Sequence, residues 1–271
     1  MRFADLHTHT YHSDGTRSPR EVIEAALRHG IEIVAISDHD HLAAYFEIRD
    51  WAAEVGITLV PAAELSAEHE GLDIHVLAYA VDPLDERLNE RLAIFREQRL
   101  TRGYRMCEKL IAAGYPVSTS RVLELCAGGA MGRPHVARAL IEAGHVTSMK
   151  EAFDKLLRPG GPGYVPKPRF AIREVVELVR AAGGVTSVAH PTLYPDHRRL
   201  IPQVLDMGVD GIEVFHPEVD PESRRFYMAL AGERNLMITG GSDDHGTAKV
   251  TETLGTVKVE EKYIRPILDR L

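Results

Sequence analysis

The sequence lacks a basic excess and long apolar runs, and each absence excludes a class of protein. Its 271 residues include 32 lysines and arginines against 40 aspartates and glutamates, a formal net charge of −8 with histidine neutral. Proteins that bind duplex nucleic acid normally present a basic surface, so we expect no binding to duplex DNA. No apolar run approaches the roughly 18 residues that a membrane span requires, and mean hydropathy is −0.16. We therefore expect no membrane span.

Cysteine is also scarce. The two cysteines, Cys107 and Cys126, do not form a CxxC motif. We expect both to be small core residues rather than a disulfide or a zinc site. Residues 1–9 contain no apolar stretch of the signal-peptide type, so we expect a cytoplasmic protein.

Short apolar runs alternate with amphipathic stretches toward both ends of the chain. Strands are predicted at 2–6, 32–37, 57–62, 74–81, 184–189, 211–215 and 236–240. Helices are predicted at 19–29, 171–182 and 221–233. The first of these helices has a favourable start at Ser18 and Pro19 and a stop at Gly30. Such repeats predict a parallel sheet, and a βα barrel places its active site at the carboxyl ends of its strands.

The middle of the chain has a different pattern. Helical periodicity covers 85–113 and 120–125, and the turn-rich segment Pro159–Gly163 follows. We expect a helical insertion over one side of the barrel mouth, where it acts as a lid that sets substrate choice. A plain set of packed surface helices is the alternative. The predicted domains are a barrel of residues 1–82 and 164–271 and an insertion of residues 83–163.

Histidine and carboxylate residues follow the predicted strands. His7 and His9 come after the first strand, and residues two apart in a strand point to the same face. They therefore form a two-nitrogen clamp suited to a transition metal. The pattern recurs at Asp14, His39, Glu64, His75, His190, His216, Asp243 and His245. One such residue is usually a capping side chain, but this recurrence supplies more ligands than one ion needs and predicts two or three clustered ions.

The combined motifs identify a family. DLHTHTYHSDG, ISDHD, AHP and GGSDDHG, together with a strand-end glutamate, resemble the PHP (polymerase and histidinol phosphatase) family over essentially the whole chain. The resemblance implies an α/β fold, a distorted (β/α)7 barrel with a helical insertion. It also implies up to three divalent metal ions and hydrolysis of phosphate esters. We expect manganese, with zinc or iron as alternatives, because all three accept imidazole and carboxylate ligands.

The resemblance also implies a role for each ligand. The implied ligands are His7, His9 and Asp243 for the first ion, His75 and His190 for the second, and Asp14, His39 and His245 for the third. Glu64 is the implied bridge between the first two ions, because its two oxygens can bind two cations. Asp243, Glu64 and His245 are the implied catalytic residues, around a hydroxide that attacks phosphorus in line. The general acid stays open, as does the oligomeric state.

Further polar residues near these motifs have less specific expectations. Asp38, Asp40 and Asp244 are expected to orient imidazoles, with simple exposure as the alternative for Asp244. Whether His12, His41 and His216 contact metal, substrate or solvent is left open. Surface positions are expected for His29, His69, His145 and His197.

The insertion carries a candidate phosphate site. Pro134 predicts a helix start, and a helix N-terminus attracts anions, so Arg133 and His135 could clamp a phosphate. A surface helix cap is the alternative. Lys167, which follows the turn-rich segment, is the third candidate. The sequence GRPH at residues 132–135 resembles the PHP subgroup of 3′,5′-nucleoside bisphosphate phosphatases, related members of which trim short RNA from its 5′ end.

The implied reaction is release of the 3′-phosphate from a nucleotide such as adenosine 3′,5′-bisphosphate, with short single-stranded RNA as a further substrate. A histidinol-phosphate phosphatase is the first alternative, although it has no evident need for Arg133, His135 or Lys167. An amidohydrolase normally uses a carbamylated lysine or a lone aspartate with four histidines, and no predicted strand end carries a lysine. A non-catalytic metal-binding or nucleotide-sensing module would have lost ligands, and every expected ligand is present here.

Overall fold

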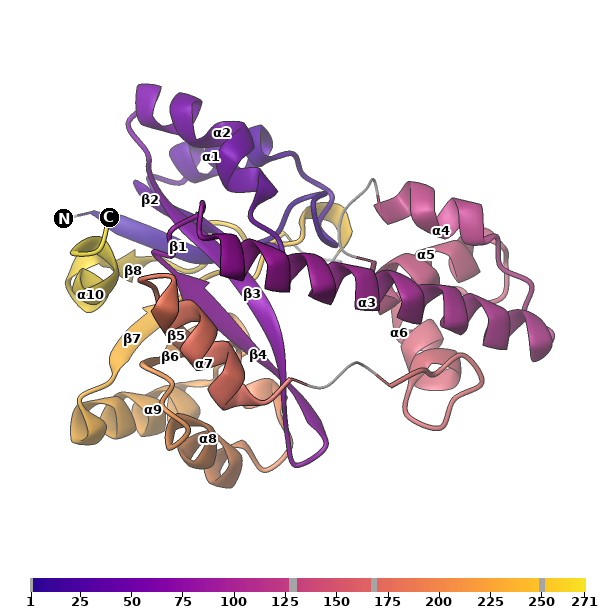
Figure 1. Ribbon diagram of the computed structural model, residues 1–271. Helices are drawn as coiled ribbons and strands as arrows, with labels where there is room; N and C mark the ends of the chain where they lie inside the picture. Colours follow the sequence, from indigo (N-terminus) through magenta and orange to yellow (C-terminus); the bar gives the residue numbers. More distant parts are fainter. Residues whose placement is uncertain (1, 127–130, 167–169, 249–251) are drawn as a thin grey trace.

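The computed structural model describes residues 2–126, 131–166, 170–248 and 252–271, so Lys167 lies outside the described residues. Eight strands form one sheet in the order β7-β6-β5-β4-β3-β2-β1-β8. The segments that follow β1 and β7 also meet, because Thr8 bridges Asp244 and the His9 N–H donates to the Asp244 carbonyl at 2.9 Å. The sheet is therefore an almost closed barrel, as the (β/α)7 prediction requires (Figure 1).

The strands lie close to their predicted positions. They are β1 (Phe3–Thr8), β2 (Ile33–Ile36), β3 (Thr58–His69), β4 (Leu72–Tyr79), β5 (Val185–Val188), β6 (Gly211–Phe215), β7 (Met237–Gly240) and β8 (Val259–Glu260). Two features were not predicted: β3 continues well past its expected end, and the two-residue β8 pairs antiparallel with β1.

The predicted all-parallel sheet is wrong at β4, which pairs antiparallel with both β3 and β5. Glu70 and Gly71 join β3 to β4 with positive φ angles of 51° and 79°. Such a tight turn suits an antiparallel hairpin, whereas a parallel pair needs a long crossover. Because β4 runs in the opposite direction, its first residues lie beside the last residues of the parallel strands. This reversal brings His75 to the barrel mouth.

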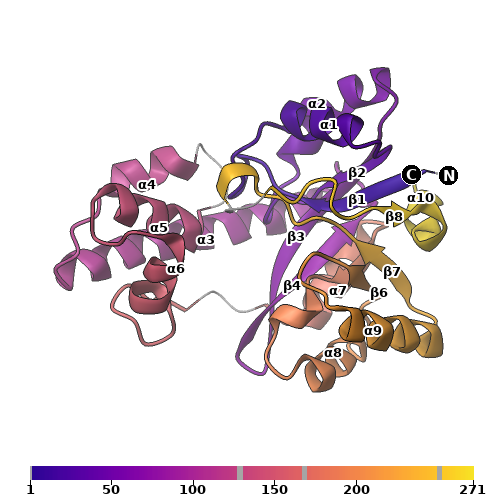
Figure 2. The same cartoon turned by 180° about the vertical axis from the view of Figure 1, so that it is seen from behind.

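The helices cover the barrel and form a separate lobe (Figures 1 and 2). Their bounds are α1 (Pro19–Arg28), α2 (Ala43–Glu54), α3 (Glu86–Ala112), α4 (Thr119–Cys126), α5 (Arg133–Glu142), α6 (Met149–Glu151), α7 (Ile172–Ala181), α8 (His197–Leu205), α9 (Pro221–Arg234) and α10 (Arg265–Leu268). Ser18 caps α1, as predicted, and the structure adds a reciprocal capping box between Ser18 and Glu21. Across the described ranges, no helix combines the length and apolarity needed to cross a membrane.

The lobe of α3 to α6 has its own apolar core. Its members include Met106, Leu110 and Leu140 together with Cys107 and Cys126, which are buried and unpaired as expected. The first half of α3 packs instead on the barrel cluster through Leu88, Leu92 and Phe95. The 27-residue helix α3 therefore connects the barrel to the lobe. Both chain termini lie on the side of the barrel away from the lobe (Figure 1).

Candidate metal centre

All nine predicted ligands converge at the mouth of the barrel. They come from β1 and its following loop (His7, His9, Asp14), the segment after β2 (His39), the middle of β3 (Glu64), β4 (His75), and the segments after β5 and β7 (His190, Asp243, His245). Neighbouring rings lie close together, with the His9 and His245 centroids 4.1 Å apart and those of His9 and His39 4.9 Å apart. Residues separated by more than 200 positions in the chain thus form one cluster.

Glu64 lies at the centre of this cluster and faces rings from four elements. Its Oε2 is 3.4 Å from His7 Nε2, 3.3 Å from His9 Nε2 and 3.1 Å from His39 Nδ1. Its Oε1 is 2.8 Å from His75 Nδ1 and 3.1 Å from His190 Nε2. The two oxygens of one carboxylate therefore face two different groups of imidazoles, which is the geometry that a bridging ligand needs.

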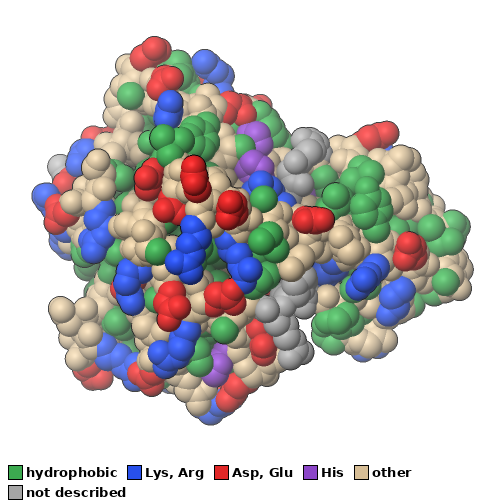
Figure 3. Space-filling view, viewed as in Figure 1, with side chains coloured by type: hydrophobic (Ala, Val, Ile, Leu, Met, Phe, Trp, Pro, Cys, Tyr) green, Lys and Arg blue, Asp and Glu red, His purple; other side chains and the backbone are tan. Residues whose placement is uncertain are grey.

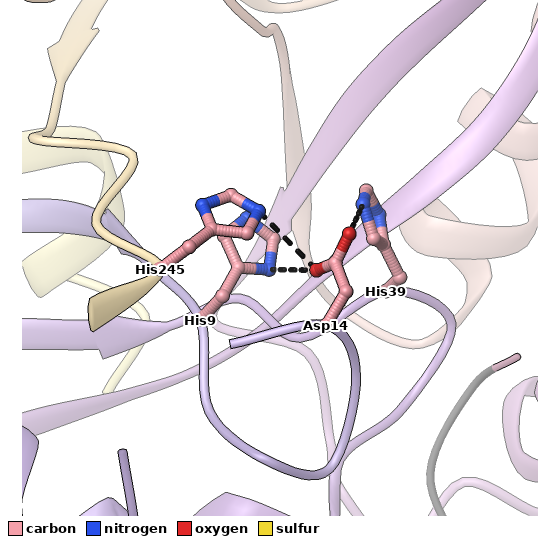
Figure 4. Close-up of side chains that lie close together, drawn as sticks. All are labelled: His9, Asp14, His39 and His245. Atoms are coloured by element: carbon pink, nitrogen blue, oxygen red, sulfur yellow. Dashed lines mark ion pairs between the residues drawn. The ribbon is translucent and has the colours of Figure 1, made fainter. Parts of the chain in front are cut away.

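Asp14 forms a second focus of the cluster (Figure 4). Its carboxylate lies between three rings, with Oδ1 3.2 Å from His245 Nε2 and 3.9 Å from His9 Nδ1, and with Oδ2 3.7 Å from His39 Nε2. Possible ligand atoms of His9, Asp14, His39 and His245 all lie within 4.8 Å of one another. This group contains the set assigned to the third ion and adds His9 to it.

Two other groups also have possible ligand atoms within 4.8 Å of one another. They are His7 with His9 and Asp243, and His39 with Glu64 and His75. The first coincides with the set assigned to the first ion, whereas the second contains His39 where His190 was expected. The assignment of ligands to particular ions remains a prediction.

The donor atoms of the cluster fit divalent cations. Several are buried polar atoms without a hydrogen-bond partner in the described part of the chain, including His7 Nε2, His9 Nε2 and His39 Nδ1. Unsatisfied buried polar atoms are costly, so a concentration of them that faces one point indicates a site for a ligand. Imidazole nitrogen and carboxylate oxygen are ligands for manganese, iron and zinc.

The electrostatics of the cluster also favour a positive charge. Burial alone would lower the pKa of His9, but Asp243, Glu64 and Asp14 raise it to about 10. Burial likewise opposes ionisation of Glu64, yet the surrounding imidazoles, foremost that of His75, hold its pKa well below the usual range. The carboxylates thus remain ionised and favour a cation among the rings.

The three aspartates that were expected to orient imidazoles behave differently. Asp38 accepts hydrogen bonds from Thr10 N at 2.8 Å and Ser13 Oγ at 2.6 Å, and Ser13 Oγ lies 3.3 Å from His9 Nδ1. Asp38 therefore reaches His9 through Ser13. Asp40 instead forms a buried ion pair with Arg99 of α3.

The expectation for Asp244 is wrong. Its side chain is buried rather than exposed, and it accepts from the backbone N–H groups of Gly246 and Thr253, both at 3.0 Å. It also pairs with Arg17. Asp244 therefore anchors the segment after β7 rather than an imidazole.

The remaining histidines divide into two kinds. His216 is buried, with Nε2 3.6 Å from Asp243 Oδ2, so it belongs to the rim of the cluster. His12 bonds Glu47 at 2.7 Å and His41 accepts from Ala43 N at 2.9 Å, outside the nine-residue cluster. The four histidines expected at the surface are exposed or half-buried: His29, His69, His145 and His197.

A cavity of about 140 Å³ opens directly beside the cluster. Asp14, His39 and His75 line it on the barrel side, and Arg99, Arg102 and Arg133 line it on the side of the lobe. Arg133 was predicted, but Arg99 and Arg102 were not. Both lie on the buried face of α3, where an arginine breaks the apolar pattern and could have been noticed. The space-filling view shows a notch between the barrel and the lobe (Figure 3).

His135, the second predicted phosphate ligand, is only 1% exposed. Its Nδ1 accepts a hydrogen bond from Gly132 N at 3.0 Å, and the ring also bonds the backbone of Ser13 in the metal loop. Both contacts are with backbone groups. The geometry therefore favours a role in holding α5 against the loop that carries Asp14.

Burial lowers the pKa of His135 to about 4, from an ordinary value of 6.5. The unfolded chain therefore binds a proton between these pH values that the folded chain does not, and acidification favours unfolding. We expect metal-free wild-type protein to lose about 2 kcal/mol more unfolding free energy between about pH 7.5 and pH 5 than His135→Asn does. Urea unfolding at both pH values measures this, and equal losses would contradict it.

The fold and the cluster together define a class: a barrel protein whose mouth is built to hold several divalent metal ions. The PHP domain matches residues 5–158, more than half of the chain. A curated relative, 5′-3′ exoribonuclease Rnm of Salmonella typhimurium, is 32% identical over 89% of this chain and 84% of its own length. The chain belongs to the PHP family.

Two further similarities extend over nearly the whole chain. The 3′,5′-nucleoside bisphosphate phosphatase of Chromobacterium violaceum is 32% identical over 98% of this chain and 95% of its own. A crystal structure described as a metal-dependent phosphoesterase from Bifidobacterium adolescentis superposes with a TM-score of 0.89 at 34% identity, covering 98% of this chain and 96% of that one. The lobe is thus included in the similarity as well as the barrel.

Proposed function

We propose that the protein is a metal-dependent phosphoesterase that removes the 3′-phosphate from nucleoside 3′,5′-bisphosphates. The same site would also trim short RNA with a 5′-phosphate from its 5′ end, by hydrolysis of the phosphodiester on the 3′ side of the first nucleotide. The observation that carries this proposal is the arginine-lined cavity directly beside the metal cluster. A substrate with two phosphates can place one on the metal ions and the other on the arginines. The relatives named as a bisphosphate phosphatase and as exoribonucleases support this substrate class.

Arg102 is the residue best suited to bind an anion in the proposed site. It is 5% exposed, and its Nε donates to the carbonyl of Val165 at 2.8 Å. Arg99 is neutralised by Asp40, but Arg102 has no carboxylate partner among the described residues. Burial, followed by the charges of Arg133 and Arg99, lowers the pKa of Arg102 to about 10. A phosphate dianion in the cavity would offset the repulsion among these buried positive charges, since guanidinium groups bind phosphate with paired hydrogen bonds.

The proposed chemistry needs two or three ions on the nine ligands described above, with manganese first and zinc or iron as alternatives. When bound, the ions supply a water nucleophile of lowered pKa and neutralise charge on the phosphoryl oxygens. Glu64 presents its two oxygens to two groups of ligands and so fixes their spacing. His245 lies at the edge of the cluster, where its Nδ1 bonds the Asp243 carbonyl at 2.9 Å and leaves Nε2 facing Asp14.

We also propose that residues 83–163 act as the lid that selects the substrate, with the barrel formed by residues 1–82 and 164–271. The lobe supplies Arg99, Arg102 and Arg133 to a cavity whose other wall belongs to the metal ligands. A histidinol-phosphate phosphatase has no evident need for these arginines. Lys167, which lies outside the described residues, remains a candidate for the same anion.

Phosphate release with added Mn²⁺ tests the proposal on adenosine 3′,5′-bisphosphate, 3′-AMP, 5′-AMP and histidinol phosphate. We expect kcat/KM to be highest for the bisphosphate, because only this substrate occupies both the metal site and the arginine cavity. A 5′-phosphorylated trinucleotide should likewise react faster than its 5′-hydroxyl counterpart. Equal rates on the bisphosphate and 3′-AMP would contradict the arginine site, and preference for histidinol phosphate would favour the alternative phosphatase.

A further inference from the structure

Strand β6 supplies none of the nine predicted ligands, yet its Glu213 reaches two of them. The side chain is fully buried, at 0% exposure. Its Oε1 is 3.0 Å from His7 Nδ1, and its Oε2 accepts a hydrogen bond from the backbone N–H of His190 at 2.6 Å. His7 is assigned to the first ion and His190 to the second, so this one carboxylate contacts a predicted ligand of each ion.

The contact with His7 determines the state of its ring. An ionised carboxylate only accepts hydrogen bonds, so His7 must carry its proton on Nδ1. Nε2 is then the nitrogen left to bind a metal ion, and it faces Glu64 and Asp243, each at 3.4 Å. If His7 carried its proton on Nε2 instead, it could not bind a metal ion there.

The contact with His190 holds an unusual backbone. His190 has φ 30° and ψ 59°, in the left-handed region that residues with a side chain rarely adopt. This conformation turns the chain sharply after β5 and places the ring with Nε2 3.1 Å from Glu64. Such strain persists only where neighbouring groups over-determine it. The 2.6 Å hydrogen bond to Glu213 is one such restraint.

We propose that Glu213 is a positioning residue that couples two metal sites, by fixing the tautomer of His7 and the backbone turn at His190 together. The inference rests on the proposed metal-dependent function. Loss of Glu213 should therefore weaken binding of two ions at once rather than one. The expected loss is about 10- to 100-fold in metal affinity, which is typical for removal of a group that orients a ligand.

Glu213→Gln is the informative variant because it keeps the shape of the side chain. An amide has one accepting oxygen and one donating nitrogen, so it cannot accept from both His7 and His190. If the amide nitrogen faces His7, Nδ1 must accept and the proton moves to Nε2. Asp210→Asn is a matched control, since Asp210 precedes the same strand and accepts from Thr186 N at 2.9 Å and from Thr186 Oγ1 at 2.8 Å, without touching the cluster.

Two measurements on the full-length protein test the proposal. Titration of metal-free protein with Mn²⁺ gives affinity and stoichiometry, and nitrogen-15 NMR of the imidazoles, with the His7 signal assigned by its loss in His7→Gln, gives the tautomer. We expect Glu213→Gln to weaken at least two ions and to reduce the Nδ1–H form of His7. Asp210→Asn should match the wild type in both measurements.

The outcomes separate this inference from the proposed function. Wild-type protein that binds no Mn²⁺ would overturn the proposed function and the inference with it. Normal Mn²⁺ binding by wild type and by Glu213→Gln, with His7 still protonated on Nδ1, would overturn the inference alone. Weakening of one ion only would overturn the coupling. Thermal unfolding of the metal-free variants verifies that Glu213→Gln remains folded. If it does not, the tautomer of His7 in the wild type decides, because a ring protonated on Nε2 but not on Nδ1 would contradict the proposal.

Discussion

Glu64→Gln is expected to lower kcat for phosphate release by about 10³-fold or more, because this one carboxylate faces both groups of predicted metal ligands. Glutamine has nearly the same shape, so it fills the same space in β3. Its amide nitrogen, however, must point its hydrogens at one of the two groups of imidazoles and cannot act as a ligand there. The loss should therefore arise from metal binding and charge, not from packing.

The measurement is kcat on adenosine 3′,5′-bisphosphate at saturating Mn²⁺, together with the metal content of the purified variant. Glu174→Gln is the matched control, because Glu174 lies on the exposed side of α7 and pairs only with Arg91 in the described structure. It should retain the wild-type rate and metal content. A Glu64→Gln variant with normal turnover would exclude the bridging role. It would also favour the view that the cluster is a structural module rather than a catalytic one.

The sequence was informative about the site wherever a ligand lies in or just after a predicted strand, because the face to which such a residue points depends on local pattern alone. His7, His9 and Glu64 could be grouped in this way before any coordinates were known. The PHP resemblance then supplied the fold and the lobe. The reversed direction of β4 could not be read from the pattern, because an apolar run has the same periodicity in either direction. His75 was nevertheless correctly placed at the mouth.

The supporting residues were much harder to predict than the ligands. Glu213 lies in the middle of a strand, and nothing in its sequence neighbourhood shows that its two oxygens meet groups 206 and 23 positions away. Asp40 and Asp244 flank metal motifs and so seemed suited to orienting imidazoles, yet each binds an arginine from another part of the chain. Contacts of this kind depend on tertiary packing, which local sequence does not encode.

Arg102→Gln should weaken the contact with the 5′-phosphate of the substrate and leave the contact with the 3′-phosphate intact. This is the second large effect that we expect. The kcat/KM for adenosine 3′,5′-bisphosphate should fall about 10²-fold, equivalent to about 3 kcal/mol, since hydrogen bonds between charged groups are among the strongest that proteins form. The kcat/KM for 3′-AMP should stay unchanged, because this substrate has no 5′-phosphate to place in the cavity. The ratio of the two values is the quantity to measure.

Arg105→Gln provides the control, since it removes the same charge from the same helix at an exposed position that does not line this cavity. If long-range attraction of an anionic substrate were responsible, both variants would lose activity and both losses would shrink at high salt. A loss confined to Arg102→Gln requires direct contact with the substrate. An equal loss on both substrates would instead show that Arg102 supports the metal centre. No loss at all would assign the 5′-phosphate to Arg133 or Lys167.

The 5′-phosphate does not react, so its binding can raise kcat only by aligning the 3′-phosphate. The division of the loss between kcat and KM therefore measures how far the arginine cavity orients the substrate.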